Sequence, residues 1–473
     1  TIEFKQMKFI VIYIVAVYLM ATFISEIPIQ EKLVNFIAGI ILGLILLSFS
    51  RYSYYFKSNH FIQIKDLEEK NKKILILNNQ KSEILSFVAH DLRAPLNNID
   101  ALSQFLLLED SKNTEINMIS SSALQAKNII NDLKNWKELI KPYATPEVKL
   151  ARKEVWKTVL PFGLLFIAAA IVYEFQFWGA LGICFLAGLF LTRIFIIQHD
   201  CGHQSFFPDR TKNDRTGFLM SLMTCIPYKY WARSHNHHHA HQGQLDTRTI
   251  GDVTLLTVRE YNELSNWGKI KYRIYRSVPV MFVLGPIYYI FIHNRIPFIK
   301  FKGWEKERLT LLRTNLYLLG FFAILGVILS LPTFDLIEGF KKLALLYIPI
   351  LITFAFTAIW FFYMQHQHDP NYKAWKEDWQ YLLAAIKGSS YYKLPKIFNF
   401  FTGNIGYHHI HHLAPKVPFY KLEKCSKENP IFQKYVTTIT LLSSVKYAFY
   451  TLWDEENYRM ITFRQLKTIP VKA

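Results

Sequence analysis

Apolar residues occur in long blocks separated by short polar tips. The blocks cover residues 7–24, 33–50, 156–173, 178–197, 311–331 and 343–363. A helix needs about 20 mainly apolar residues to cross the hydrocarbon core of a bilayer. The pattern therefore predicts six membrane-spanning helices, arranged as three hairpins.

The charges at the ends of these blocks predict their orientation. The tips at 25–32 and 174–177 carry little or no Lys and Arg, whereas an aromatic and basic stretch, Arg51–Lys57, follows the second block. Positive charge favours the cytoplasmic side, so the tips are expected outside and the other ends in the cytoplasm. Ser277–Ile292 is apolar but short and contains two prolines, so we expect an interfacial or re-entrant segment.

Between the first two hairpins the pattern becomes amphipathic. Apolar residues at helical spacing over 60–90 and 114–140 predict two long helices with a coiled-coil-like seam. Between them lies Ser86-Phe-Val-Ala-His90-Asp91-Leu-Arg-Ala-Pro-Leu96, and a turn-rich linker follows at 141–146.

This hairpin resembles the dimerisation and phosphoacceptor hairpin of two-component sensor histidine kinases. The resemblance implies that His90 accepts phosphate with help from Asp91. Position 94 is Ala where many relatives carry a Thr or Asn implicated in phosphatase action. No ATP-binding pattern follows the hairpin, so His90 would need a kinase in trans. The simpler interpretation is that the segment only dimerises the protein.

Composition supports a membrane protein. Hydrophobic residues make up 51% of the 473 residues and aromatic residues 16%, and the formal net charge is +19. An excess of Lys and Arg on the cytoplasmic side explains this charge, and no nucleic-acid module is present, so we expect no nucleic-acid partner. The four cysteines form no CxxC pair, which fits a reducing cytoplasm. We therefore expect a multi-pass protein of the cytoplasmic (inner) membrane.

Histidines are concentrated at a few places along the chain. Thirteen of the 16 lie in or beside three clusters and a Gln365-His366-Gln-His368 segment; the clusters are His199–His203, His235–His239 and His408–His412. Positions i, i+3 and i+4 share one face of a helix. A lone histidine is more often structural than a ligand, but three such sets next to predicted spans favour a metal centre. Eight imidazoles are too many for one ion, and imidazole suits Fe, Zn, Cu and Ni alike.

The clusters resemble those of the membrane fatty-acid desaturases, over residues 148–425. The flanking residues are most similar to bacterial acyl-lipid enzymes of the Δ12/ω-6 type. The resemblance implies two Fe ions with O2 as co-substrate, and it implies nine metal ligands: His199, His203, His235, His238, His239, His366, His408, His411 and His412. Asn404 and Asp200 are expected in the layer behind these ligands.

Other polar residues near the clusters are candidates for supporting roles or are ordinary surface residues. Asp246 and Asp252 are further candidates to hold the far nitrogens of ligand imidazoles, or are ordinary surface charges. Four histidines lie off the motif positions and are expected to be supporting or surface residues: His237, His241, His368 and His409.

The resemblance also implies partners. The substrate would be a membrane acyl lipid, and the cycle would need two electrons. No haem-binding motif occurs in the chain, so a separate ferredoxin-type or other small electron donor is implied. Four basic residues are candidates to dock it, although ordinary cytoplasmic charge is the simpler interpretation: Arg210, Lys212, Arg215 and Lys229. Residues 60–140 would support a homodimer.

The expected fold is an all-α integral membrane protein. The domains would be a two-span membrane hairpin (1–58), kinase-like helices (59–141), a linker (142–150), a four-span desaturase-like bundle with a cytoplasmic histidine-rich cap (151–430) and a helical cytoplasmic tail (431–473). Two other functions stay open. One is a di-iron lipid hydroxylase or ketolase, and the other is a membrane signalling protein phosphorylated in trans on His90.

Overall fold

The computed structural model describes residues 4–24, several positions between 26 and 35, residues 120, 124 and 127–129, and residues 131–467 except 249 and 300–302. The chain divides into two units, Thr1–Asn98 and Ile99–Ala473. In the first unit, helix α1 (Phe4–Ile24) matches the first predicted span. The second predicted span at 33–50 and the predicted phosphoacceptor pair, His90 and Asp91, lie outside the described residues.

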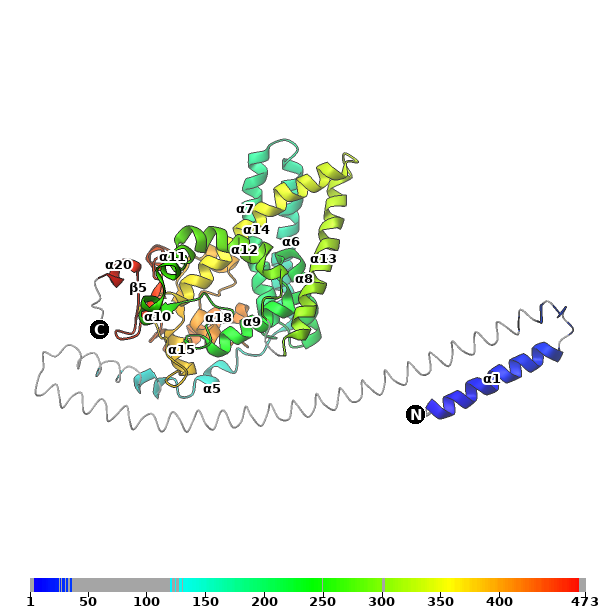
Figure 1. Cartoon of the computed structure of the whole chain (residues 1–473), viewed down its shortest axis with the longest axis horizontal. Coiled ribbons are helices and arrows are strands. Elements are labelled where there is room, and N and C mark those ends of the chain that lie inside the picture. Colours follow the sequence, from blue (N-terminus) through cyan, green and yellow to red (C-terminus); the bar gives the residue numbers. More distant parts are fainter. Residues whose placement is uncertain are drawn as a thin grey trace, which may run out of the picture. The chain divides into compact units, whose positions relative to one another are not determined.

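Four long helices form the centre of the second unit (Figure 1). They are α6 (Val148–Val172), α7 (Phe177–Gly202), α13 (Glu305–Ser330) and α14 (Leu336–His366), and each is long and apolar enough to cross a membrane. α7 is the most buried of them and packs against α6 and α14. The described helices thus confirm the four-span bundle.

These helices extend beyond the predicted apolar blocks. The 31 residues of α14 correspond to about 46 Å at 1.5 Å per residue, against about 30 Å for a hydrocarbon core. α7 ends at Gly202, with His203 as its C-cap, and α14 ends at His366. The histidines therefore lie on final turns that can project past the apolar layer.

Shorter helices gather at the histidine-bearing end of the bundle (Figure 1). α8 begins at an Asp209 cap, whose side chain accepts a hydrogen bond from the backbone N–H of Lys212. The short elements are α5 (Trp136–Ile140), α8 (Arg210–Thr224), α9 (Tyr228–His241), α10 (Val258–Glu263), α15 (Tyr381–Lys387), α16 (Lys396–Phe401), α17 (His408–Leu413), α18 (Phe419–Glu428), α19 (Leu441–Tyr447), α20 (Phe463–Leu466) and the 3₁₀ turn η3 (Pro430–Gln433).

The segment expected to be interfacial or re-entrant is broken. It contains α11 (Asn266–Tyr275), the π-helical turn η1 (Val280–Leu284), α12 (Gly285–Phe291) and the 3₁₀ turn η2 (His293–Arg295). The two halves, Asn266–Tyr275 and Val280–Arg295, are bent by 57°. This bend is the geometry of a broken span or a re-entrant loop.

Two small sheets supplement the helices. β1 (Leu256–Thr257) pairs parallel with β4 (Leu452–Asp454), which pairs antiparallel with β5 (Arg459–Ile461). β2 (Ser390–Tyr392) pairs parallel with β3 (Thr437–Ile439). Residues 431–473, expected as a helical tail, therefore also contain three strands. β3 and β4 form because this segment returns to pair with β2 and β1, which lie far away in the sequence, and β5 then pairs with β4.

Candidate metal centre

Four elements bring nine histidines together at one end of the bundle. The end of α7 carries His199 and His203, and α14 ends at His366. α9 carries His235, His238 and His239, and α17 carries His408, His411 and His412. All nine are buried, and the most exposed of them, His235, has 8% of its surface exposed. These are the nine residues that the sequence predicts as ligands.

The first group contains five of these imidazoles. One ring nitrogen from each lies within 4.8 Å of the others; the members are His199, His203, His235, His239 and His411. Nε2 of His239 lies 3.1 Å from Nε2 of His235 and 3.1 Å from Nε2 of His411. The group therefore draws on all three predicted clusters.

The second group lies beside the first. Nitrogens of His238, His366 and His412 lie within 4.8 Å of one another. His408 adjoins them, because its Nε2 lies 2.9 Å from Nε2 of His366 and 3.1 Å from Nε2 of His412. The rings of His239, in the first group, and His412, in the second, stack with centroids 4.1 Å apart, so the two groups are in direct contact.

The two HxxHH clusters divide between the groups in opposite ways. On α9, the i and i+4 residues His235 and His239 join the first group and the i+3 residue His238 joins the second. On α17, the i+3 residue His411 joins the first group, while the i and i+4 residues adjoin the second. At 3.6 residues per turn, positions i+3 and i+4 point about 100° apart, so one turn of helix can serve two neighbouring centres.

The ring nitrogens fit a metal ion better than mutual hydrogen bonds. A neutral imidazole has one N–H, yet Nε2 of His366 faces two imidazole nitrogens, at 3.2 Å in His238 and 2.9 Å in His408. The buried Nε2 of His203 has no hydrogen-bond partner among the described residues. A metal–imidazole bond of about 2.1 Å places two ligand nitrogens at a right angle about 3 Å apart. The observed spacing fits this arrangement.

Burial also favours the ligand form of these rings. Desolvation, followed by neighbouring imidazoles, lowers the pKa of His235, His239 and His411 well below 6.5. The same causes lower the pKa of His408 and His412. The rings are therefore neutral near pH 7 and can donate a lone pair to a metal.

Asp200 orients one histidine of the first group. Its Oδ1 lies 2.9 Å from Nδ1 of His199, and its Oδ2 accepts a hydrogen bond from the backbone N–H of Phe419 at 2.6 Å. A carboxylate accepts only, so His199 carries its proton on Nδ1 and leaves Nε2 free. The structure thus places Asp200 where the sequence predicts a supporting residue.

The other predicted supporting residues are placed differently. Oδ2 of Asp252 lies 3.7 Å from Nδ1 of His238, but Asp246 accepts a hydrogen bond from the backbone N–H of Lys376 instead. Asn404 adopts a left-handed backbone conformation with φ of 56°, in the turn before α17. Its expected role through a water molecule stays a prediction.

Sequence reasoning missed a residue that supports the second group. Nε2 of Gln242 lies 3.3 Å from Nδ1 of His366 and donates to the carbonyl of Gly388 at 2.7 Å. Gln242 is the C-cap of α9 and follows His238 by four positions. That i, i+4 spacing to a predicted ligand is the signal that could have identified it.

Five of the described histidines lie outside both groups: His237, His241, His293, His368 and His409. His293 stacks on Tyr289 with ring centroids 5.1 Å apart. His237 and His241 stack with ring centroids 4.2 Å apart. Nδ1 of His368 lies 2.7 Å from the carbonyl oxygen of Pro370, and Nε2 of His409 lies 3.4 Å from Nε2 of Gln433. These contacts give each ring a local structural role.

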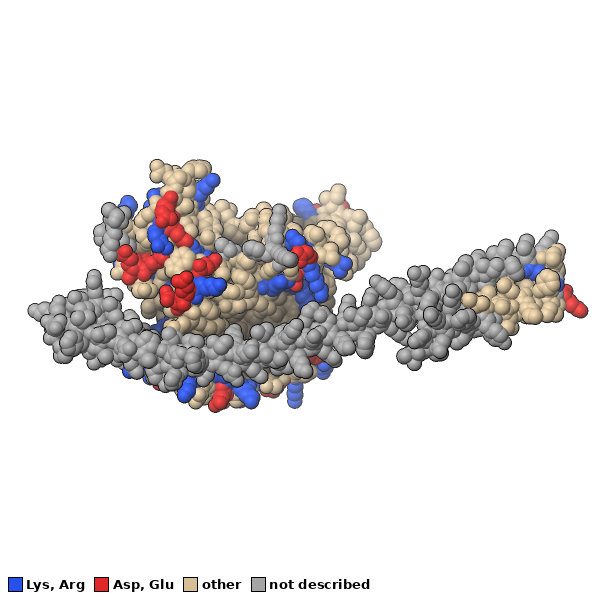
Figure 2. All heavy atoms as spheres, turned by 60° about the horizontal axis from the view of Figure 1, so that its bottom comes forward, with Lys and Arg blue, Asp and Glu red and all other residues tan. Residues whose placement is uncertain are grey.

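The basic candidates for donor docking do not form a uniform patch. Arg210, Lys212 and Arg215 are exposed on α8, whereas Lys229 pairs with Asp214. On the face in Figure 2, Lys and Arg side chains lie among Asp and Glu side chains. The net positive charge is therefore interspersed with acidic groups on this face.

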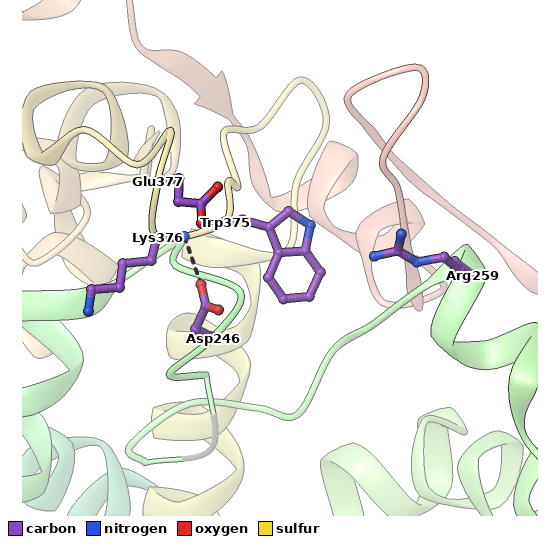
Figure 3. Close-up of a pocket in the computed structure, with 5 residues that line it drawn as sticks. All are labelled: Asp246, Arg259, Trp375, Lys376 and Glu377. Carbon is purple, nitrogen blue, oxygen red and sulfur yellow. Dashed lines mark hydrogen bonds between the residues drawn. The ribbon is translucent and has the colours of Figure 1, made fainter.

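A polar pocket of about 360 Å³ is lined by Asp246, Arg259, Trp375, Lys376 and Glu377 (Figure 3). The indole Nε1 of Trp375 donates to Glu455 at 2.9 Å. Charged groups line most of this pocket, so it is unsuited to an apolar chain.

Comparison with known proteins agrees with this site. The fatty acid desaturase family model matches residues 176–442, and the His Kinase A phosphoacceptor domain matches residues 80–137. A fatty acid desaturase of Bacillus subtilis (strain 168) is 40% identical over 345 residues, covering 73% of this chain and 95% of that protein.

More distant relatives are also desaturases. A Delta(12)-fatty-acid desaturase of Arabidopsis thaliana is 28% identical, over 52% of this chain and 65% of its own length. An sn-1 acyl-lipid omega-3 desaturase (ferredoxin) of Nostoc sp. (strain 36) is 24% identical, over 61% of this chain and 78% of its own. With four helices apolar enough to span a bilayer, this is a membrane protein. The chain belongs to the fatty acid desaturase family and is an oxidoreductase, with a histidine-kinase phosphoacceptor segment ahead of its desaturase region.

Proposed function

We propose that the chain is an O2-dependent acyl-lipid desaturase that introduces a cis double bond through two irons held by the nine histidines. The observation that carries this proposal is the pair of adjoining imidazole groups at the ends of apolar helices. Five histidines would hold one iron, and four would hold the other: His238, His366, His408 and His412.

Removing hydrogen from an unactivated methylene needs chemistry that protein side chains lack. Bound irons would supply it, with two hydrogens of the acyl chain, two electrons and two protons reducing one O2 to two waters. The chain's own residues fix the ligands. Asp200 sets the tautomer of His199. The Gly388 carbonyl, which Gln242 holds by a hydrogen bond, lies 3.4 Å from Nδ1 of His366 and can accept its proton when Nε2 is the ligand atom.

Charge balance supports the same assignment. Neutral imidazoles leave the charge of two bound cations uncompensated, and burial makes that costly. Two carboxylates lie behind the ligands, Asp200 beside His199 and Asp252 beside His238. They would offset part of the positive charge while the imidazoles remain the ligands.

The remaining assignments follow from the relatives and the charge pattern. We place the protein in the cytoplasmic membrane with the metal centre facing the cytoplasm, where a ferredoxin-type donor would deliver electrons. The name of the Nostoc relative supports both an acyl-lipid substrate and this donor class. Residues 1–58 would form a membrane hairpin, 59–141 the kinase-like helices, 142–150 the linker, 151–430 the desaturase domain and 431–473 a cytoplasmic tail.

The test is expression of the full chain in a host that lacks desaturation, with double-bond analysis of its lipids. The wild type should produce cis-unsaturated acyl chains, and His239→Ala should produce none. His237→Ala is the matched control, because His237 lies on the same helix but outside both groups. Hydroxylated or keto lipids would instead support the hydroxylase or ketolase alternative. An iron-loaded, reduced wild type that leaves the lipids unchanged would refute the proposal.

A further inference from the structure

The end of the kinase-like region packs into the desaturase region. We call the described residues 127–129 and 131–147 the docking segment; the kinase-domain match ends at residue 137, within it. Ile129 and Leu133 are 1% and 0% exposed and belong to the same hydrophobic cluster as Leu422 and Phe432. The segment therefore shares the core of the desaturase region, and Figure 1 shows its helix α5 below α15 and α18.

Polar contacts hold the docking segment at both ends. Near its start, the Asp132 carboxylate pairs with Lys434 at 2.6 Å and accepts a hydrogen bond from the hydroxyl of Tyr435. Near its end, Tyr143 bonds to Glu428, and Asn429 donates to the Tyr143 hydroxyl at 3.3 Å. These partners flank η3 and the C-terminal end of α18, which together form the docking surface.

The linker strengthens the attachment. Lys421 donates to the carbonyl of Thr145 at 2.7 Å, and the backbone N–H of Glu147 donates to the Tyr420 hydroxyl at 3.0 Å. Both partners lie in the first turn of α18. The docking segment thus contacts both the first turn and the last turn of α18.

The docking surface leads directly to the histidine groups. At the start of α18, the backbone N–H of Phe419 donates to Asp200, which holds His199. In η3, Nε2 of Gln433 lies 3.4 Å from Nε2 of His409, which directly follows the α17 ligand candidate His408. A continuous set of contacts therefore joins the docking segment to the first and third histidine clusters.

We propose that the docking segment is the interface through which the N-terminal kinase-like region controls the geometry of the metal centre. When the segment is docked, α18 and η3 hold Asp200 and His409 in place. When it is displaced, these supports loosen and the ligands lose their orientation. The proposal rests on the proposed function for the role of the ligands, but the coupling itself can be measured without turnover. The test therefore perturbs the docking segment and measures the response at the histidine-bearing segments.

The experiment reverses charges at one contact. Asp132→Lys places like charges against each other, and the double variant Asp132→Lys/Lys434→Asp restores an opposite pair. Lys134→Glu is the control, because it also reverses a charge on the docking segment at an exposed position. Each full-length protein is purified in detergent, and hydrogen–deuterium exchange is followed over residues 127–147, 198–207 and 419–433.

Asp132→Lys should raise exchange at least threefold in 419–433 and in 198–207, and lower double-bond yield. The double variant should return both readouts to within twofold of wild type, and Lys134→Glu should change neither. Increased exchange confined to 127–147 in Asp132→Lys would overturn the proposal, since the segment would then be a passive attachment. If exchange couples as expected while the wild type makes no olefin, the proposed function fails and the coupling stands.

Discussion

Asp200 and His199 are neighbours in sequence, and their side chains meet at 2.9 Å between Oδ1 and Nδ1. Both lie in the last turn of α7 and are buried. The other carboxylate oxygen binds the first backbone N–H of α18, so one residue supports a candidate ligand and fixes a distant helix at once.

Replacing Asp200 by Asn should therefore weaken the centre while preserving the fold. Substitution of such a partner typically costs 10–100-fold in metal affinity or activity. We expect a loss in that range in double-bond yield, together with iron stoichiometry below wild type by elemental analysis. Asp246→Asn is the control, because Asp246 binds a loop backbone N–H instead of a histidine. Equal effects of the two variants would contradict the assignment.

Gln242→Leu tests the support of the second group. The change removes the contact to His366 and leaves the Gly388 carbonyl without its donor at 2.7 Å. We expect roughly a tenfold loss of activity, the lower end of effects at such positions. Iron content should decrease by at most one atom per protein, because the first group keeps its ligands. His241→Ala, one residue earlier and outside both groups, should bind iron as the wild type does.

The metal-free protein should lose stability as the pH falls below about 6.5, the pKa of an unfolded histidine. Burial holds the folded-state pKa of His235, His239 and His411 well below that value, so the unfolded chain takes up protons first. Stability is fully present above pH 6.5, and each such histidine removes about 1.4 kcal/mol per pH unit below it. Thermal unfolding of the metal-free protein between pH 5 and 8 checks this. A melting temperature that is flat down to pH 5 would exclude buried neutral imidazoles.

Gly188 should tolerate no side chain, because α7 and α14 touch there. A Cβ at this position would lie 2.5 Å from the Thr353 Cβ and 2.9 Å from the Ile350 carbonyl oxygen. Gly188→Ala should cost about 1–3 kcal/mol through overpacking. Gly182→Ala, on the same helix, meets no atom within 4 Å and should be neutral or stabilising. Detergent-solubilised melting temperatures of the two variants compare them.

Leu133→Ala should destabilise the desaturase region itself. Leu133 is fully buried, and removal of such a side chain costs about 2–5 kcal/mol. Leu139 lies six residues further on and is 37% exposed, so Leu139→Ala should change stability by about 0.5 kcal/mol or less. If both variants melt alike, the docking segment contributes nothing to this core.

The spans and the histidine pattern were readable from sequence because they are local signals. Block length predicts α6, α7, α13 and α14, and the three clusters with the Gln-His segment identify the nine converging rings. Gln242 was missed because its partner His366 lies 124 positions away. β3 and β4 were missed because three-residue strands are stabilised by partners elsewhere in the chain, which periodicity cannot reveal.

The sequence by itself determined that this is a helical membrane protein with histidine clusters at the ends of its spans, because apolar length and i, i+3, i+4 spacing are properties of single helices. The desaturase family followed from the resemblance of those clusters. Only the tertiary structure decided how the rings are shared. His235 and His239 join His411, whereas His238 faces His366. Side chains at neighbouring positions of α9 point in different directions, and the position of α14 and α17 decides which partner each of them meets. Tertiary packing likewise placed the docking segment on α18. Ile129 and Leu133 are buried in one cluster with Leu422 and Phe432, which are distant in sequence, so their burial could not be read from the local pattern.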